Sequence, residues 1–452
     1  MNKSKLARAA LAALVWITLT GITPAPAQSV DALLDKLVEK GILSAKEAGD
    51  LRAESDKGFT KAYAAKTGMP DWVSALKFNG DFRGRYEGFF GENPAFVQRN
   101  RFRYRLRFGV TAELLDDLEV GFRLSSSERV GEFGGDPISG NTSFSDNGSK
   151  KFVFIDLAYA KWSPWHTAPW AGAVTVGKME NPFASPSTMM FDRDYTPEGI
   201  AAQIAYSFND HHQLKFNAAG FILDELAASS RDPWLAGAQL RWDGKWSTNF
   251  STTLGVAGFL ISNRENLSNA NVPNSNRGNT RNASGAPQFG FNPVYVDGGI
   301  TWTLDEFPLY PGAFPIRLTG DYVNNPAAPR DNQGYSVGFA FGKAGRKGAW
   351  ELAYRWEELR GDAWFEEFPE SDFGAYYQAQ QANAGFNSAS NPTGAGYGAG
   401  TNVRGHAVKL SYSPYNSFTL GVTCFVTDLI RPSPAGSTSG MTRLQVDGVL
   451  KF

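Results

Sequence analysis

The sequence has 452 residues but only one cysteine, Cys424, and four histidines. A single cysteine excludes a disulfide framework and a cysteine-cluster metal site, and the scattered histidines argue against a histidine-rich metal centre. Lysine and arginine (44) balance aspartate and glutamate (45), so the charge indicates no nucleic-acid partner. After residue 21 no stretch approaches the roughly 20 apolar residues that a membrane helix needs. The composition therefore excludes a helical membrane protein and indicates no metal and no cofactor.

The first residues have the parts of a secretory signal. A basic start precedes a short apolar run over 9–22, and Ala25-Pro26-Ala27 has the small-x-small pattern of a cleavage site. We expect residues 1–27 to be a signal peptide and the mature chain to begin at Gln28; a retained anchor is the alternative. Export of a chain with almost no cysteine is typical of the bacterial envelope.

Residues 28–70 carry apolar residues at helical spacing, with charged residues between them. Gly41 separates two expected helices, and Ser44 with Glu47 forms a capping-box pattern at the start of the second. Pro70 ends the segment. Such a helix pair is too small to fold alone, so we expect either a short periplasmic coiled coil or a helical hairpin packed against another surface.

From residue 75 onward the hydrophobic period is two. In RNRFRYRLRF (99–108), every second residue is an arginine from Arg101 to Arg107, and aromatic or aliphatic residues alternate with them. A strand places all four arginines on one face, whereas a helix would spread them around its axis. Sixteen such segments predict strands over 75–90, 98–113, 117–127, 151–162, 172–180, 197–208, 211–221, 232–243, 247–261, 292–304, 313–324, 333–343, 347–359, 402–413, 416–428 and 442–452.

The connections between these segments alternate between short and long, and the longest cover 262–291 and 360–401. Tight turns at one rim and longer loops at the other are typical of a transmembrane β-barrel. Aromatic residues that end the even-numbered segments fit a girdle at one lipid–water boundary: Phe108, Trp162, Tyr206, Trp242, Trp302, Tyr412 and Phe452. We therefore expect an all-β protein, with residues 71–452 forming an antiparallel transmembrane β-barrel of about 16 strands.

Several motifs carry a family resemblance: LLDKLVEKGILSAKEA (33–48), RNRFRYRLRFG (99–109), VGKMENPF (176–183) and TPEGIAAQ (196–203), together with the terminal Phe452. On these, the chain resembles the bacterial outer-membrane putative-porin family, which includes the phosphate-selective porins. The resemblance implies a homotrimer of sixteen-stranded barrels in the outer membrane of a Gram-negative bacterium. It also implies that Phe452 is a signal to the outer-membrane assembly machinery. Phosphate selectivity is not implied, because the lysine and arginine clusters that define it cannot be placed here.

A barrel of this size leaves a water-filled lumen, so inward positions should be polar. The expected pore-lining residues are Arg83, Arg85, Arg101, Arg103, Arg105, Arg107 and Arg123. Two interpretations of this arginine wall remain open. It attracts anions or orients dipolar solutes, or its arginines pair with Asp81, Glu87, Glu113 and Glu119 and stiffen the barrel.

The third external loop of sixteen-stranded porins commonly folds into the pore, and here that loop covers 181–196. Its apolar residues suggest contact with the inner wall, and Asp192, Arg193 and Asp194 are its expected constriction residues, with the aspartates facing the arginine wall.

The sequence thus predicts a porin for passive diffusion of small hydrophilic solutes or ions, embedded in outer-membrane lipid, and the first interpretation of the arginine wall adds a preference for anions. An adhesion or structural barrel is the alternative. An outer-membrane enzyme is a weaker one, because we find no nucleophile motif and no partner for the isolated histidines.

Overall fold

The computed structural model describes residues 37–38, 40, 43–44, 46–49, 51, 70–94, 96–130, 134–267, 278–375, 398–432 and 438–452. The chain divides into two units, residues 1–73 and 74–452. The expected signal peptide and most of the segment 28–70 lie outside the described residues. Among the residues described, no helix is long and apolar enough to cross a membrane.

The expected capping box is present in the first unit. The backbone nitrogen of Ser44 donates to Glu47 Oε2 (2.8 Å), and the backbone nitrogen of Glu47 donates to Ser44 Oγ (3.2 Å). Residues 46–49, which follow Ser44, are helical. The reciprocal bonds satisfy two backbone donors that the first turn of a helix leaves without an intrahelical partner.

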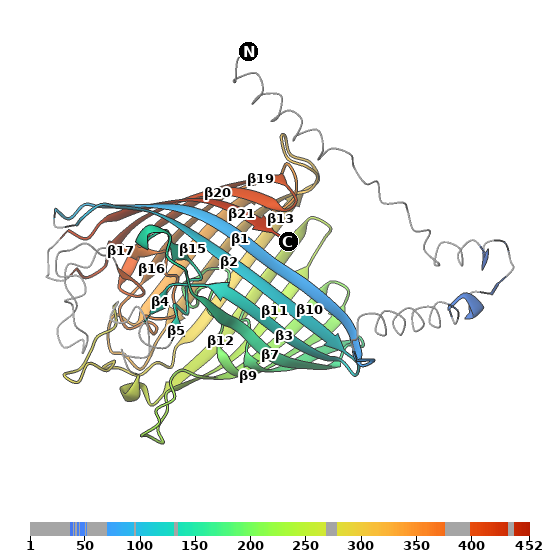
Figure 1. Ribbon diagram of the computed structural model, residues 1–452, viewed down its shortest axis with the longest axis horizontal. Coiled ribbons are helices and arrows are strands. Elements are labelled where there is room, and N and C mark those ends of the chain that lie inside the picture. The colour runs from blue at the N-terminus through green and yellow to red at the C-terminus, as the bar shows by residue number, and fades with distance from the viewer. Residues whose placement is uncertain are drawn as a thin grey trace, which may run out of the picture. The chain divides into compact units, whose positions relative to one another are not determined.

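The second unit is a closed antiparallel barrel of sixteen long strands, which confirms the fold class expected from the sequence (Figure 1). The strands are β1 (Val73–Gly91), β2 (Arg99–Leu114), β3 (Leu118–Ser126), β7 (Val153–Trp165), β8 (Trp170–Lys178), β9 (Glu198–Asn209), β10 (His212–Ile222), β11 (Trp234–Lys245), β12 (Phe250–Ser262), β13 (Val294–Leu304), β14 (Phe314–Asn324), β15 (Gln333–Gly342), β16 (Trp350–Leu359), β19 (Val403–Tyr415), β20 (Phe418–Leu429) and β21 (Met441–Lys451). Each one overlaps a predicted strand, and pairing of β1 with β21, from Asp81↔Lys451 to Gly91↔Met441, closes the ring.

Short secondary-structure elements lie in the loops of the barrel. They are β4 (Arg129–Val130), β5 (Gly134–Gly135), β6 (Thr142–Ser143), β17 (Gly374–Ala375), β18 (Gly398–Ala399) and the 3₁₀ turns η1 (Asp146–Gly148) and η2 (Arg264–Asn266). The connections alternate in length as expected: β9 and β10 are joined by 210–211, whereas 263–293 follows β12 and 360–402 follows β16. Short turns therefore gather at one rim and long loops at the other.

The outer face of the strands is apolar, as contact with lipid requires. On β2, Phe102, Leu106 and Phe108 are exposed, while Arg103 and Arg105 point inward and are buried. Of the seven aromatic residues expected at the rim, six are exposed and Tyr206 is half-buried.

The last residue closes one edge of the barrel. Phe452 exchanges two backbone hydrogen bonds with Gly80 (2.9 and 3.1 Å), and its exposed ring covers that glycine. A Cβ at Gly80 would lie 2.5 Å from the ring, so this close approach requires glycine.

Part of the barrel interior is an apolar core. The sequence analysis expected contact of loop 181–196 with the inner wall, but it expected the inward residues of the strands to be polar. Buried inward residues on β10, β11, β12 and β13 pack against residues of the long loops. The wall contributes Phe221, Leu235, Phe259 and Tyr295, and the loops contribute Phe183, Met189, Met190, Phe191, Phe291, Trp364, Phe365 and Phe368. Three long loops therefore fold into the lumen on this side, because these side chains cannot face water at that density without a large cost in free energy.

Candidate functional site: a constriction inside the barrel

Loop 179–197, between β8 and β9, lies inside the barrel. Met189 and Met190 are fully buried in the apolar core, and Trp364 donates through Nε1 to the carbonyl of Met190 (2.7 Å). The loop also touches the wall, because the backbone nitrogen of Ala184 donates to Gln239 Oε1 on β11 (3.0 Å). Apolar packing and backbone bonds together fix the path of the loop.

A second segment, residues 360–375, runs against this loop. The backbone nitrogen of Glu370 donates to the carbonyl of Thr188 (3.1 Å), and that of Asp192 donates to the carbonyl of Phe368 (2.6 Å). The backbone nitrogen of Ser371 donates to Asp192 Oδ2 (2.9 Å). The two loops therefore form one insert in the lumen.

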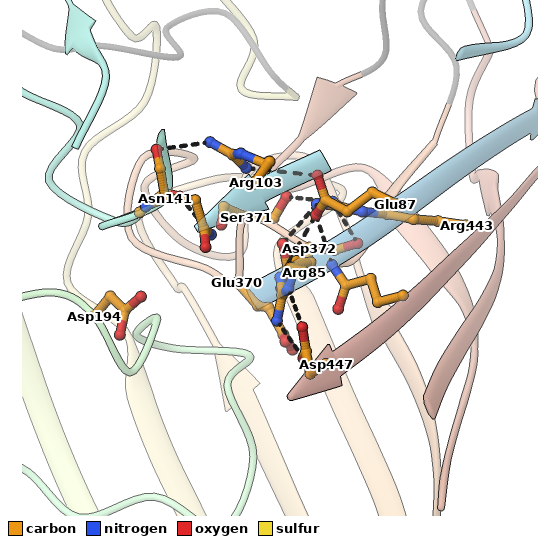
Figure 2. A network of polar contacts seen from close by, with 12 residues as sticks. Arg85, Glu87, Arg103, Asn141, Asp194, Glu370, Ser371, Asp372, Arg443 and Asp447 are labelled. Atoms are coloured by element: carbon orange, nitrogen blue, oxygen red, sulfur yellow. Dashed lines mark hydrogen bonds and ion pairs between the residues drawn. The ribbon is translucent and has the colours of Figure 1, made fainter. Parts of the chain in front are cut away.

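The arginines of the wall are ion-paired, and Glu87 on β1 is the centre of one network (Figure 2). Its carboxylate, which is completely buried, lies 2.5 Å from Arg101 Nε, 2.6 Å from Arg443 Nη2 and 3.6 Å from Arg103 Nη1. Gln445 donates to the same carboxylate. Buried charges at this density require such partners, because desolvation of an unpaired ion is very costly.

Two aspartates neutralise the next arginines along β2. Asp81 accepts from Arg105 (2.9 Å) and Arg107 (2.6 Å), and Asp194 of the loop accepts from Arg105 Nη1 (2.8 Å). Asp194 therefore faces the arginine wall and is in direct contact with it. The contact offsets the cost of desolvation, because Asp194 and Arg105 are both largely buried.

Arg123 on β3 is paired with two carboxylates, Asp156 (2.5 Å) and Glu180 (2.5 Å). Asp156 is the extra residue of a bulge in the pairing of β3 with β7, where Arg123 pairs with Leu157 and Leu124 pairs with Ile155. Bulges re-aim side chains in this way. Of the four acidic partners proposed from the sequence, Asp81 and Glu87 pair with the wall, whereas Glu113 pairs with Lys77 and Glu119 with Lys161.

Two arginines differ from these. Arg83 on β1 donates to Asn141 Oδ1 (2.7 Å), and no carboxylate of a described residue lies within 4.0 Å of its guanidinium nitrogens. Arg193, at the tip of the loop, is exposed and likewise has no ion-pair partner among the described residues. Arg85, their neighbour, is paired with Asp447 (2.7 Å) and Asp372 (2.9 Å).

The loop carboxylates differ in pKa. Burial, reinforced by the Asp194 and Glu370 carboxylates, raises the pKa of Asp192 well above its ordinary value. Burial also opposes ionisation of Asp194, but the charges of Arg105 and Arg83 outweigh it and hold the pKa of Asp194 below its ordinary value. Asp194 therefore stays ionised at pH values at which Asp192 takes up a proton.

The insert leaves two cavities in the lumen. One, of about 510 Å³, is bordered by β1, β14–β16 and β19–β21 and by both loops, and Arg83, Arg85, Asp192, Arg193 and Asp194 line it. The other, of about 630 Å³, lies toward β2, β3 and β7 and is lined by Arg105, Arg107 and again Asp194. Arg101, Arg103 and Arg123 line neither of these two cavities.

Three residues that organise the site were missed by the sequence analysis: Trp364, Asp372 and Arg443. One signal was present, since WFEEFPESDF (364–373) is an apolar cluster within a long loop, the same feature that marked 181–196. Within the described ranges, no group of three or more His, Cys, Asp or Glu side chains is placed to hold a metal ion.

This architecture, a sixteen-stranded barrel with an apolar outer surface and a polar passage narrowed by an internal loop, defines a diffusion channel of the outer-membrane class. Residues 92–292 match the model of the family described as "Putative porin". No curated protein matches the sequence.

Two solved structures are similar to this chain. The high-pH structure of Pseudomonas putida OprB has a TM-score of 0.52 and 12% identity, over 88% of this chain and 97% of that one. Salmonella typhi OmpF in complex with daunomycin has a TM-score of 0.45 and 11% identity, over 83% and 97% of the two chains. The chain is similar to this porin family over residues 92–292 and shares the barrel fold of an outer-membrane porin, which indicates a channel for passive diffusion of solutes in the bacterial outer membrane.

Proposed function

We propose that the channel favours small anionic solutes, and that this preference comes from Arg83 and Arg193 rather than from the paired arginines of the wall. The observation that carries the proposal is that both line the 510 Å³ cavity without a carboxylate partner among the described residues. Charged groups that line a narrow passage set which ions enter it.

The other arginines contribute less to such a preference. An arginine beside a carboxylate presents a dipole to a passing ion, and the field of a dipole falls faster with distance than that of a single charge. Arg101, Arg103, Arg105, Arg107 and Arg123 all have such partners. We therefore assign to these five arginines the second role that the sequence suggested, which is to stiffen the barrel. Arg85 is also paired, although it lines the passage.

Further parts of the proposal rest on the sequence. Residues 1–27 act as the export signal, residues 28–70 form a periplasmic helical segment and the barrel follows from residue 71. Three barrels associate in outer-membrane lipid, and Phe452 directs the chain to the assembly machinery. The exposed ring of Phe452 supports this last role, because it is accessible on the strand edge.

The reversal potential in a salt gradient across a planar bilayer tests the anion preference. We expect Arg83→Gln to shift it toward cations, and the shift to shrink at 1 M salt, where the Debye length is about 3 Å. Arg103→Gln is the matched control: it removes the same charge from the next strand but lines neither cavity. Equal shifts in both variants, or no shift in Arg83→Gln at low salt, would contradict the assignment.

A further inference from the structure

We propose that residues 360–375 form a strap across the barrel interior, that the strap sets the width of the passage together with loop 179–197, and that Asp372 holds it in place. The proposal rests on the channel function given above. It adds a positioning residue that determines which solute sizes pass.

One end of the strap is fixed in the apolar core. Trp364 is completely buried, and its ring lies 5.3 Å from that of Phe259 on β12 and 6.4 Å from that of Phe291. Two residues further on, Glu366 pairs with Arg281, and both side chains are buried. This end is therefore anchored on the side of β12.

The other end is fixed at the opposite wall. Asp372 accepts from Arg85 Nη1 on β1 (2.9 Å) and from Arg443 Nη2 on β21 (2.7 Å), as Figure 2 shows. Phe373 follows, with its ring 6.3 Å from that of Phe425 on β20. When the sixteen strands of the ring are counted from β1, β12 is the ninth and therefore lies across the barrel from β1. The segment between Trp364 and Asp372 therefore crosses the lumen.

The strap borders the passage near its Asp372 end. Glu370, Ser371 and Asp372 line the 510 Å³ cavity together with wall residues such as Thr319 and Lys409. The strap is also bonded to Thr188 and Asp192 of loop 179–197. A solute that moves through this cavity therefore passes both loops, and the width depends on how firmly the strap is held.

Asp372→Asn removes the ion pairs that join the strap to the wall and leaves the bonds from Arg443 Nη1 to the carbonyls of Ser371 and Asp372, so it loosens the strap with little damage to the wall itself. Arg85 keeps Asp447 as a partner and Arg443 keeps Glu87. Asp447→Asn is the matched control, because it removes one carboxylate from the same arginine and the same cavity but lies on β21 rather than on the strap. Both variants remove a partner of Arg85, but only Asp372→Asn weakens the attachment of the strap.

The measurement is the swelling rate of proteoliposomes in uncharged mono-, di- and trisaccharides, which separates size from charge. We expect Asp372→Asn to raise the rate for the larger sugars several-fold relative to the monosaccharide, and Asp447→Asn to keep the wild-type ratio. Phe373→Ala loosens the same end without removing a charge and is expected to act like Asp372→Asn. If Asp372→Asn does not fold, which a missing heat-modifiable band on a gel would show, Phe373→Ala alone tests the proposal.

A wild-type size profile in both strap variants would overturn the proposal. This result is distinguishable from failure of the proposed function. If Arg83→Gln shifts the reversal potential while the strap variants leave the size profile unchanged, only the strap is refuted. If neither Arg83→Gln nor the salt concentration affects selectivity but Asp372→Asn admits larger sugars, the anion preference is refuted and the strap stands.

Discussion

Two sides of the barrel interior are filled with different kinds of side chains. On β1, β2 and β21, inward side chains such as Arg85 and Arg105 are charged, buried and paired, and four arginines surround Glu87. On β10 to β13, inward side chains such as Phe221 and Leu235 are apolar and packed under the long loops. The 510 Å³ cavity is bordered by β1 and β21 of the charged side and by β14–β16, β19 and β20.

The difference teaches that an inward position on a strand is not the same as a position that faces water. The row from Arg101 to Arg107 suggested a wet wall, because four cations on one face repel each other unless something screens them. In the structure the screening comes from carboxylates on β1 and on loop 179–197. Of the described cationic side chains that line the 510 Å³ cavity, Arg83 and Arg193 are the two that water and passing ions must screen.

The apolar side is expected to give the largest effect. Trp364→Ala removes a fully buried indole and its hydrogen bond to Met190, which should cost about 3–5 kcal/mol in the free energy of unfolding. Chemical denaturation followed by heat-modifiable gel migration measures the loss. Trp302→Ala, at the exposed rim, should cost far less. An equal loss in both variants would show that the interior core adds no stability beyond that of the barrel.

The charged side of the interior is expected to give the second-largest effect. Glu87→Gln leaves Arg101 and Arg443 buried with a neutral amide in place of their shared carboxylate. Removal of one member of a buried pair costs about 3–5 kcal/mol, and the retained amide oxygen should hold the loss near the lower end. The same denaturation assay checks it, with Glu113→Gln, whose partner Lys77 is exposed, as the control. If Glu87→Gln lowers the free energy of unfolding no more than Glu113→Gln does, the other carboxylates are sufficient to hold the arginines of the wall.

Periodicity predicted the barrel well because each strand's alternation is local and the pattern repeats sixteen times. It also predicted the capping box, since Ser44 and Glu47 are three residues apart. The site was harder to predict because its contacts join distant residues. Arg85 meets Asp372 and Asp447, and Arg105 meets Asp194, through the closure of the ring and the fold of the loops. No spacing in the sequence reports such pairs.

The smallest expected effect concerns Asp192, a residue of the insert that lines the passage. The pKa of Asp192 is raised by burial and by the Asp194 and Glu370 carboxylates, so it gains a proton as the pH falls toward the ordinary aspartate value of about 3.9. The pKa of Asp194 is held low by Arg105 and Arg83 despite burial, so Asp194 keeps its charge over that range.

The cavity therefore loses one negative charge first at Asp192, and the anion preference should increase modestly as the pH falls. The folded state binds this proton more tightly than the unfolded chain, so the contribution of Asp192 to stability is greatest at low pH and is lost as the pH rises through its folded pKa. Reversal potentials measured from neutral to mildly acidic pH should change in the wild type and change less in Asp192→Asn, which has no group to titrate there. Asp305→Asn, an exposed position between β13 and β14, should keep the wild-type response. If Asp192→Asn responds to pH as the wild type does, the titrating group lies elsewhere in the passage.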